Sequence, residues 1–278
     1  MIKRSFLTLV TFLFMTISFA YAGDWSKIKI GTEGAYPPWN GMNAAGELEG
    51  AEIDLVFDLC ARMNAECELV AQDWDGIIPA LQNGKYDAII AGMSITEERM
   101  KEINFSQGYA NEPASFSVLK SSKLAALKAG GKVNMDALDG TSTALLDSLK
   151  KALKGTTVGV QGSTTHENFV KQVLGDSVTM KSYDTQENLE LDLSVGRIDA
   201  ALSDQGSMEK FMESDNGKDI IFIGPGLGGG PFGEGVGVGL RKRDTDLLKM
   251  FNSAIDAARA DGTLAEHFTK WFGKDISM

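Results

Sequence analysis

The fold is indicated by the stretch Asn83-Gly84-Lys85-Tyr86-Asp87-Ala88-Ile89-Ile90, in which a helix end is followed by a glycine, a basic residue and a short apolar strand. The same order recurs as Val195-Gly196-Arg197-Ile198-Asp199-Ala200-Ala201-Leu202 in the second half of the chain. A strand with so few polar residues is typical of a parallel sheet that is covered on both faces. We therefore expect two α/β lobes, each containing one copy of this unit.

Strand and helix patterns alternate around both copies. In the first half of the chain we expect a strand over 28–31 that is followed by Pro37 and Pro38, a helix over 51–64, a strand over 67–71 and a short helix over 76–83. In the second half, a strand over 156–160 leads into a helix at about Glu167. Such alternation predicts mainly parallel sheets flanked by helices, which bind ligands beyond the carboxyl ends of their strands.

The chain is long enough for two lobes, and we expect it to cross between them twice. The expected first lobe is discontinuous and combines residues 23–110 with residues 233–278. The expected second lobe spans residues 111–232. Two hinge strands, near Ala110–Ala114 and Gly224–Phe232, are expected to join the lobes.

Two further segments carry no identifiable chemistry. The glycine-rich run at 224–233 lacks the Lys-Ser or Lys-Thr pair of a phosphate-binding loop, so a crossing between lobes is preferred to a nucleotide site. The polar segment at 120–154 is rich in alanine, lysine and glycine, and contains an amphipathic helix expected at 144–153.

The N-terminus has the pattern of a secretory signal peptide. Lys3 and Arg4 precede an apolar run from Phe6 to Phe19, and Ala20-Tyr21-Ala22 has the small-residue pattern of a cleavage site. The apolar run is shorter than the roughly 20 residues of a spanning helix, so cleavage after Ala22 and a periplasmic protein are expected rather than an anchor. Acidic residues outnumber basic ones by 38 to 27, which makes nucleic acid an implausible partner.

Cysteine and histidine are too scarce for a metal site. Cys60 and Cys67 form an even, closely spaced pair, which in an exported chain predicts a disulfide between a helix and the following strand. His166 and His267 are the only histidines of the sequence, so we expect no metal cluster, no Cys-His catalytic pair and no cofactor.

Polar residues follow four of the expected strands. Glu33 and Tyr36 come after the first strand, Ser94–Arg99 after the second, Gln161–Thr165 after the third, and Asp204 after the fourth. Two of these strand ends belong to each expected lobe. A cleft between the lobes would bring the four groups together.

Each of these groups has a structural interpretation beside the functional one. Ser94 and Glu97 fit a capping box, whereas Arg99, just inside the helix start, fits a seat for a carboxylate. The turn Gln161-Gly162-Ser163-Thr164-Thr165 is either an ordinary helix cap or a second contact to an anion. Asp204 is either a turn former or an acceptor for an ammonium group.

Two aromatic residues are candidates for contact with a ligand side chain. Trp74 lies between Asp73 and Asp75 in an expected loop, where small polar residues are more usual. Tyr36 and Trp74 would enclose a flat or cationic group, with Glu33 as its charge partner. The alternative is that both rings pack against their own lobe.

The combination of motifs resembles the polar-amino-acid periplasmic binding proteins of ABC importers over nearly the whole mature chain. The motifs are Gly31-Thr32-Glu33-Gly34-Ala35-Tyr36-Pro37-Pro38, Gly50-Ala51-Glu52-Ile53-Asp54-Leu55, Trp74-Asp75-Gly76-Ile77-Ile78-Pro79-Ala80-Leu81, Met93-Ser94-Ile95-Thr96-Glu97-Glu98-Arg99, Gly196-Arg197-Ile198-Asp199-Ala200 and Gly237-Val238-Gly239-Leu240-Arg241-Lys242. The branch is similar to the lysine/arginine/ornithine, histidine, octopine and nopaline binders. The resemblance implies a type II two-lobed fold and a disulfide between Cys60 and Cys67.

The resemblance also implies a role for each candidate residue. Arg99 and Thr164 would hold the ligand α-carboxylate with help from Ser94, and Asp204 would hold the α-ammonium group. The remaining candidates would line the pocket or face the ligand side chain, namely Glu33, Tyr36, Trp74, Gln161 and Thr165.

This chain departs from the lysine and arginine binders at three positions. Ala91 and Gly92 stand where those proteins have serines, which removes hydroxyl donors and opens space. Glu33 replaces the more usual aspartate, so the counter-charge reaches further. These departures favour arginine, or an opine built on arginine, over lysine.

The expected function is that of a monomeric receptor that closes on one solute, docks on a membrane permease and catalyses nothing. A dehydratase of cyclic amino acids on the same fold is the alternative from another class, but no histidine or spare acid is expected beside the ligand as a general acid or base. A binder of polar neutral amino acids is a further alternative. A sensor domain would need a membrane segment after Met278, where the sequence ends.

Overall fold

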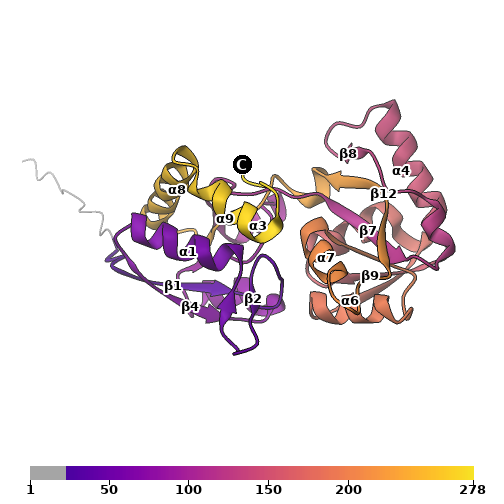
Figure 1. The fold of residues 1–278 in the computed structure, drawn as a ribbon. Coiled ribbons are helices and arrows are strands. Elements are labelled where there is room, and N and C mark those ends of the chain that lie inside the picture. The colour runs from indigo at the N-terminus through magenta and orange to yellow at the C-terminus, as the bar shows by residue number, and fades with distance from the viewer. Residues whose placement is uncertain (1–22) are drawn as a thin grey trace, which may run out of the picture.

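The computed structural model describes residues 23–278, so the signal peptide expected at 1–22 lies outside the described residues. The chain forms two lobes that are joined by two crossing segments (Figure 1). Each lobe has its own sheet and its own large hydrophobic core. Within residues 23–278, no helix is long and apolar enough to span a bilayer.

The first lobe is built on a five-stranded sheet with the order β4-β1-β5-β13-β6. Its strands are β1 (Lys27–Thr32), β4 (Glu66–Ala71), β5 (Ala88–Ile89), β6 (Asn104–Phe105) and β13 (Gly239–Leu240). Its helices are α1 (Ala51–Arg62), the 3-10 turn η1 (Trp74–Gly76), α2 (Ile77–Gln82), α3 (Glu97–Glu102), α8 (Thr245–Ala260) and α9 (Thr263–Phe272). A small hairpin of β2 (Gly41–Met42) and β3 (Leu48–Glu49) precedes α1.

The second lobe is built on a six-stranded sheet with the order β10-β9-β11-β7-β12-β8. Its strands are β7 (Ala114–Leu119), β8 (Lys132–Asn134), β9 (Thr157–Gln161), β10 (Thr179–Tyr183), β11 (Ala200–Asp204) and β12 (Ile220–Gly228). Its helices are α4 (Gly140–Leu153), α5 (Thr165–Phe169), α6 (Gln186–Ser194) and α7 (Gln205–Met212). Short turns of helix lie at η2 (Lys123–Ala126), η3 (Val170–Leu174), η4 (Gly175–Ser177) and η5 (Gly230–Phe232).

Both sheets contain parallel pairs, as the sequence pattern predicts, and antiparallel pairs beside them. β1 is parallel to β4 and β5, β9 is parallel to β10 and β11, and β12 is parallel to β8. The antiparallel pairs are β13 with β5 and β6, and β7 with β11 and β12. β7 enters the second lobe from one crossing and β12 runs back toward the other, so these two strands have to point in opposite directions.

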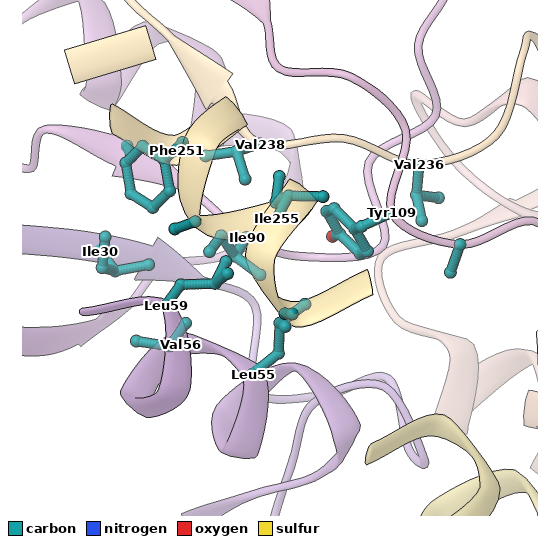
Figure 2. Close-up of a cluster of buried hydrophobic side chains, with 14 of the residues drawn as sticks. Ile30, Leu55, Val56, Leu59, Ile90, Tyr109, Val236, Val238, Phe251 and Ile255 are labelled. Atoms are coloured by element: carbon teal, nitrogen blue, oxygen red, sulfur yellow. The ribbon is translucent and has the colours of Figure 1, made fainter. Parts of the chain in front are cut away.

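The core of the first lobe is made by segments from both ends of the described chain. Ile30 of β1 and Leu59 of α1 belong to the same buried cluster as Phe251 and Ile255 of α8 (Figure 2). All four side chains are fully buried. Burial of each contributes about 1.5–3 kcal/mol to the free energy of folding, compared with an exposed side chain. The C-terminal segment is therefore an integral part of the first lobe.

The segment at 120–154 belongs to the second lobe. Its helix, α4, begins after Asp139, whose side chain accepts a hydrogen bond from the Ser142 backbone N–H at 2.7 Å. Leu146, Leu149 and Leu153 of α4 are buried in the core of this lobe. This part of the chain therefore has a packing role.

The crossing segments run side by side at one point, where the Val236 backbone N–H donates to the Ala110 carbonyl at 2.8 Å. The second crossing begins after Gly228, within the expected hinge at Gly224–Phe232 but later than its first residue. Residues up to Gly228 remain in β12, where Leu227 pairs with both Ala114 and Val133. The first sheet takes its strands from 27–105 and 239–240, and the second from 114–228. These strand ranges support the proposed first lobe, made of residues 23–110 and 233–278, and the proposed second lobe, made of residues 111–232.

The disulfide expected from the cysteine spacing is formed. Cys60 of α1 is bonded to Cys67 of β4, and their Cα atoms are 6.2 Å apart. The bond ties the first helix to the edge strand of the first sheet.

The double substitution Cys60→Ala and Cys67→Ala should lower the free energy of unfolding by about 2 kcal/mol, because the short loop is no longer closed in the unfolded chain. Urea unfolding of the oxidised protein and the variant measures the difference. Wild-type protein kept reduced during unfolding is the control and should match the variant. Equal stability of the oxidised protein and the variant would contradict the prediction.

Candidate functional site

A cavity lies between the two lobes. Every ligand-binding residue predicted from the sequence lines it, together with His166: Glu33, Tyr36, Trp74, Ala91, Gly92, Ser94, Arg99, Gln161, Thr164, Thr165 and Asp204. The structure thus brings all of the predicted site residues to one place.

The cavity lies where parallel strands end. In the first lobe, Glu33 directly follows β1, and Ala91 follows β5 after one residue. In the second lobe, Gln161 is the last residue of β9 and Asp204 is the last residue of β11. The carboxyl ends of strands from both sheets therefore face the same cavity, as expected for α/β folds.

Side chains from the two lobes are in direct contact across the cavity. The Gln161 side-chain amide donates to Glu33 Oε1 at 2.7 Å, and the Tyr36 hydroxyl donates to Asp204 Oδ2 at 2.9 Å. Trp74 Nε1 donates to the backbone carbonyl of Ser163 at 3.2 Å. These hydrogen bonds hold the lobes in a closed arrangement.

Arg99 is the cationic group of the cavity. Its guanidinium donates to the backbone carbonyls of Ser94 (3.0 Å) and Ser163 (3.3 Å), and its Cζ atom lies 5.2 Å from the centre of the Trp74 ring. Loss of solvation lowers the pKa of Arg99 to about 10, so the group stays charged at neutral pH. Within residues 23–278, no carboxylate forms an ion pair with it, so its charge is available to an anion.

Glu33 is an acidic group of the same cavity. Burial raises its pKa to about 7, and the hydrogen bond from Gln161 opposes this shift. The negative charges of Asp73, Glu52 and Asp75 raise the pKa of Glu33 further. This region of the cavity is therefore electrostatically favourable for a cation.

Asp204 faces the cavity instead of capping a helix. It precedes α7 at the N-cap position, but its side chain makes no capping hydrogen bond. One carboxylate oxygen accepts from Tyr36, and the other lies 3.2 Å from His166 Nε2. The side chain is thus placed by contacts to other cavity residues.

The start of α3 does not follow the capping-box interpretation of Ser94 and Glu97. Helix α3 is capped by Thr96, whose hydroxyl accepts from the Arg99 backbone N–H at 3.2 Å. The chain is extended at Thr96, which places the helix start two residues later than predicted. Ser94 is left free to line the cavity. Thr164, in contrast, both caps α5 and lines the cavity.

Sequence and structure comparisons identify the family. The model for bacterial extracellular solute-binding proteins, family 3, matches residues 28–274. The chain belongs to this family.

Relatives of this family 3 protein include binding proteins for amino acids and opines. The octopine-binding periplasmic protein of Rhizobium meliloti is 39% identical, and the alignment covers 92% of this chain and 93% of the relative. The L-arginine-binding protein of Pseudomonas aeruginosa is 36% identical, with 92% and 91% covered. A solved structure of an ancestral arginine-binding protein bound to arginine has a TM-score of 0.74 at 31% identity, with 89% of this chain and 99% of that chain covered. The two-lobed fold is confirmed, and the named relatives are binding proteins and not enzymes.

His166 is the cavity residue that sequence analysis missed, and the expectation that no histidine lies beside the ligand site was wrong. The family 3 protein has this side chain buried at the start of α5, next to Asp204. Sequence reasoning considered the histidines only for metal, cysteine-paired or acid-base chemistry, and not as part of the ligand cavity. His166 directly follows Thr165, which belongs to a turn already assigned to the cleft. This position could have indicated that His166 lines the cavity.

Glu33→Gln should stabilise the family 3 protein more at pH 8 than at pH 4.5. The folded-state pKa of about 7 lies above the ordinary value of 4.5, so wild-type stability falls as the pH rises between these values. The difference is at most about 3 kcal/mol, measured by urea unfolding at both pH values. Glu68→Gln, at an exposed position, is the control and should show little pH dependence. An equal effect of Glu33→Gln at both pH values would refute the assignment.

Proposed function

We propose that the protein captures an amino acid with a cationic side chain, arginine or an opine derived from arginine, in the interlobe cavity. The observation that supports this most directly is the charge pattern of the cavity, in which Arg99 is accompanied by Glu33 and Asp204. Arginine carries the complementary set of one carboxylate and two cationic groups. A neutral amino acid would leave Glu33 without a cationic partner.

The backbone groups of the ligand are assigned to residues of both lobes. Arg99 of the first lobe would hold the α-carboxylate through a charge-assisted pair, with Thr164 of the second lobe and Ser94 as further donors. Asp204 of the second lobe would accept hydrogen bonds from the α-ammonium group. A ligand held in this way contacts both lobes and favours their closed arrangement.

The ligand side chain is assigned to the wall formed by the first lobe. Glu33 would pair with the guanidinium, and Tyr36 and Trp74 supply aromatic surface beside it. Ala91 and Gly92 have no polar side chain, which leaves room for a larger ligand such as an opine. Gln161 would exchange its contact with Glu33 for one with the ligand.

The cellular role is proposed from the family. The relatives named above are binding proteins, which supports delivery of the solute to an ABC permease. Cleavage of the N-terminal signal peptide would place the protein in the periplasm, and we propose that it works as a monomer. The neighbouring His166 and Asp204 resemble the acid-base groups that a dehydratase would need, but we retain binding as the function.

The first test is a thermal-shift screen of the mature protein, stripped of carried-over ligand, against the common amino acids, octopine and nopaline. Arginine or an opine should raise the melting temperature by several degrees, because a ligand of the folded state stabilises it by mass action. Stabilisation by neutral or acidic amino acids alone would contradict the proposal. Incubation with the ligand, followed by NMR, would reveal an enzyme through consumption of the compound.

Arg99→Ala should weaken binding of every amino-acid ligand at least about a hundredfold, because the ligand carboxylate loses its charged partner. Calorimetric titration with arginine measures the loss. Arg243→Ala removes an exposed arginine from the same protein and should bind like the wild type. Wild-type affinity in Arg99→Ala would overturn the site assignment.

Arginine affinity should be highest above pH 7 and should fall at lower pH by up to about tenfold per unit, because guanidinium binding requires ionised Glu33, whose pKa is about 7. Titrations from pH 5.5 to pH 8.5 test this. Citrulline, the uncharged analogue of arginine, should not share the dependence on Glu33. A parallel fall for both ligands would refute this role of Glu33.

A further inference from the structure

Glu52 is a buried carboxylate to which the proposed function gives no role. It is the second residue of α1 and its exposed fraction is 0%. It does not line the interlobe cavity. Within residues 23–278, no lysine, arginine or histidine forms an ion pair with it. A carboxylate in such a place is costly unless hydrogen bonds satisfy it, so its contacts need an explanation.

The contacts of Glu52 come from three separate segments of the first lobe. Oε1 accepts from the Gly92 backbone N–H at 2.7 Å and from the Tyr109 hydroxyl. Oε2 accepts from the Asn40 side-chain amide at 2.7 Å. The side-chain oxygen of Asn40 in turn accepts from the Gly34 backbone N–H at 2.8 Å. Burial raises the pKa of Glu52, and these hydrogen bonds oppose the shift.

The polarity of this network excludes an amide side chain at position 52. The backbone N–H groups of Gly34 and Gly92 are donors that cannot be reversed. Asn40 uses its oxygen for Gly34, so it presents its NH₂ group to Glu52. A glutamine at position 52 would place its own NH₂ group against one of these donors, so at least one hydrogen bond would be lost.

The three segments all lie beside the ligand cavity or the hinge. Gly34 directly follows Glu33, and Gly92 is itself part of the cavity wall. Tyr109 lies where the first crossing leaves the lobe, next to the Ala110 and Val236 contact (Figure 2). Its ring stacks on Phe268 with centroids 6.2 Å apart. One carboxylate therefore joins both cavity loops of this lobe to the start of the hinge.

We propose that Glu52 is a positioning residue that fixes the Glu33 and Gly92 loops to the hinge residue Tyr109, so that ligand seating in the first lobe is coupled to lobe closure. The coupling part of this role rests on the proposed function, whereas the positioning part does not. Glu52 also acts at a distance, because its charge contributes to the raised pKa of Glu33. Its loss should therefore change the pH profile of arginine binding as well as the affinity.

The first experiment compares Glu52→Gln with Glu190→Gln by amide hydrogen exchange without ligand. Glu190 is a matched control, because it is a buried carboxylate in the second lobe that accepts a hydrogen bond from Gln186. In Glu52→Gln the Gly34 or Gly92 amide should exchange at least about tenfold faster. Glu190→Gln should leave both rates unchanged. Wild-type exchange of both amides in folded Glu52→Gln would overturn the proposal.

The second experiment titrates the same variants with L-arginine between pH 5.5 and pH 8.5. Glu52→Gln should bind about tenfold more weakly at pH 8, and the midpoint of its pH profile should move to lower pH, because Glu33 loses a negative neighbour. Glu190→Gln should match the wild type in both respects. Glu52→Gln with wild-type affinity and an unchanged midpoint would refute the coupling.

Tyr109→Phe tests the hinge contact alone and replaces Glu52→Gln if that variant does not fold. It keeps the ring against Phe268 and removes only the hydroxyl, so the Gly92 amide should stay protected while arginine affinity falls about fivefold. Wild-type affinity in Tyr109→Phe would overturn the link to the hinge. Failure of the wild type to bind arginine or octopine would refute the proposed function, while the exchange rates would still decide the positioning role of Glu52.

Discussion

The two lobes meet where the parallel strands of both sheets end, and this constraint creates the site. A side chain placed just beyond β1 or β5 faces the residues placed just beyond β9 or β11. Neither lobe has the full charge pattern by itself, because Arg99 and Glu33 come from the first and Asp204 from the second. The cavity is complete only in the closed arrangement that the hydrogen bonds of Tyr36 and Gln161 hold together.

Local patterns and the family resemblance predicted the cavity residues other than His166, because the ends of short apolar strands are marked by composition. Two kinds of feature were not predictable in this way: the choice between neighbouring capping residues, and the pairing of strands that lie far apart in the sequence. Ser94 and Thr96 are both good capping residues, and only the backbone path selects Thr96. The glycines at 224–228 look like a loop but pair within β12, whose register shifts between Ile223 and Leu227. The direction of β7 and β12 follows from the two crossings and not from their residues.

Electrostatics gives the proposed ligand class a physical basis. Glu33 and Glu52 are buried carboxylates of the first lobe, and the charge of Glu52 raises the pKa of Glu33. Burial of negative charge is unfavourable until a cation arrives or a proton is taken up. Arginine would supply that cation, while its carboxylate would satisfy Arg99. Binding of the ligand would then neutralise the charge of the cavity. Closure of the lobes would follow because the ligand contacts both of them.

The discontinuous first lobe has a consequence for the order in which the chain acquires structure. Phe251, Ile255 and Phe268 complete the core around β1 and α1, yet they lie near the end of the sequence. The N-terminal strands must therefore wait for α8 and α9 until synthesis is almost finished. All strands of the second lobe lie within 114–228 and are available earlier. A chain emerging from the ribosome, or through an export channel, can thus assemble its middle before its beginning.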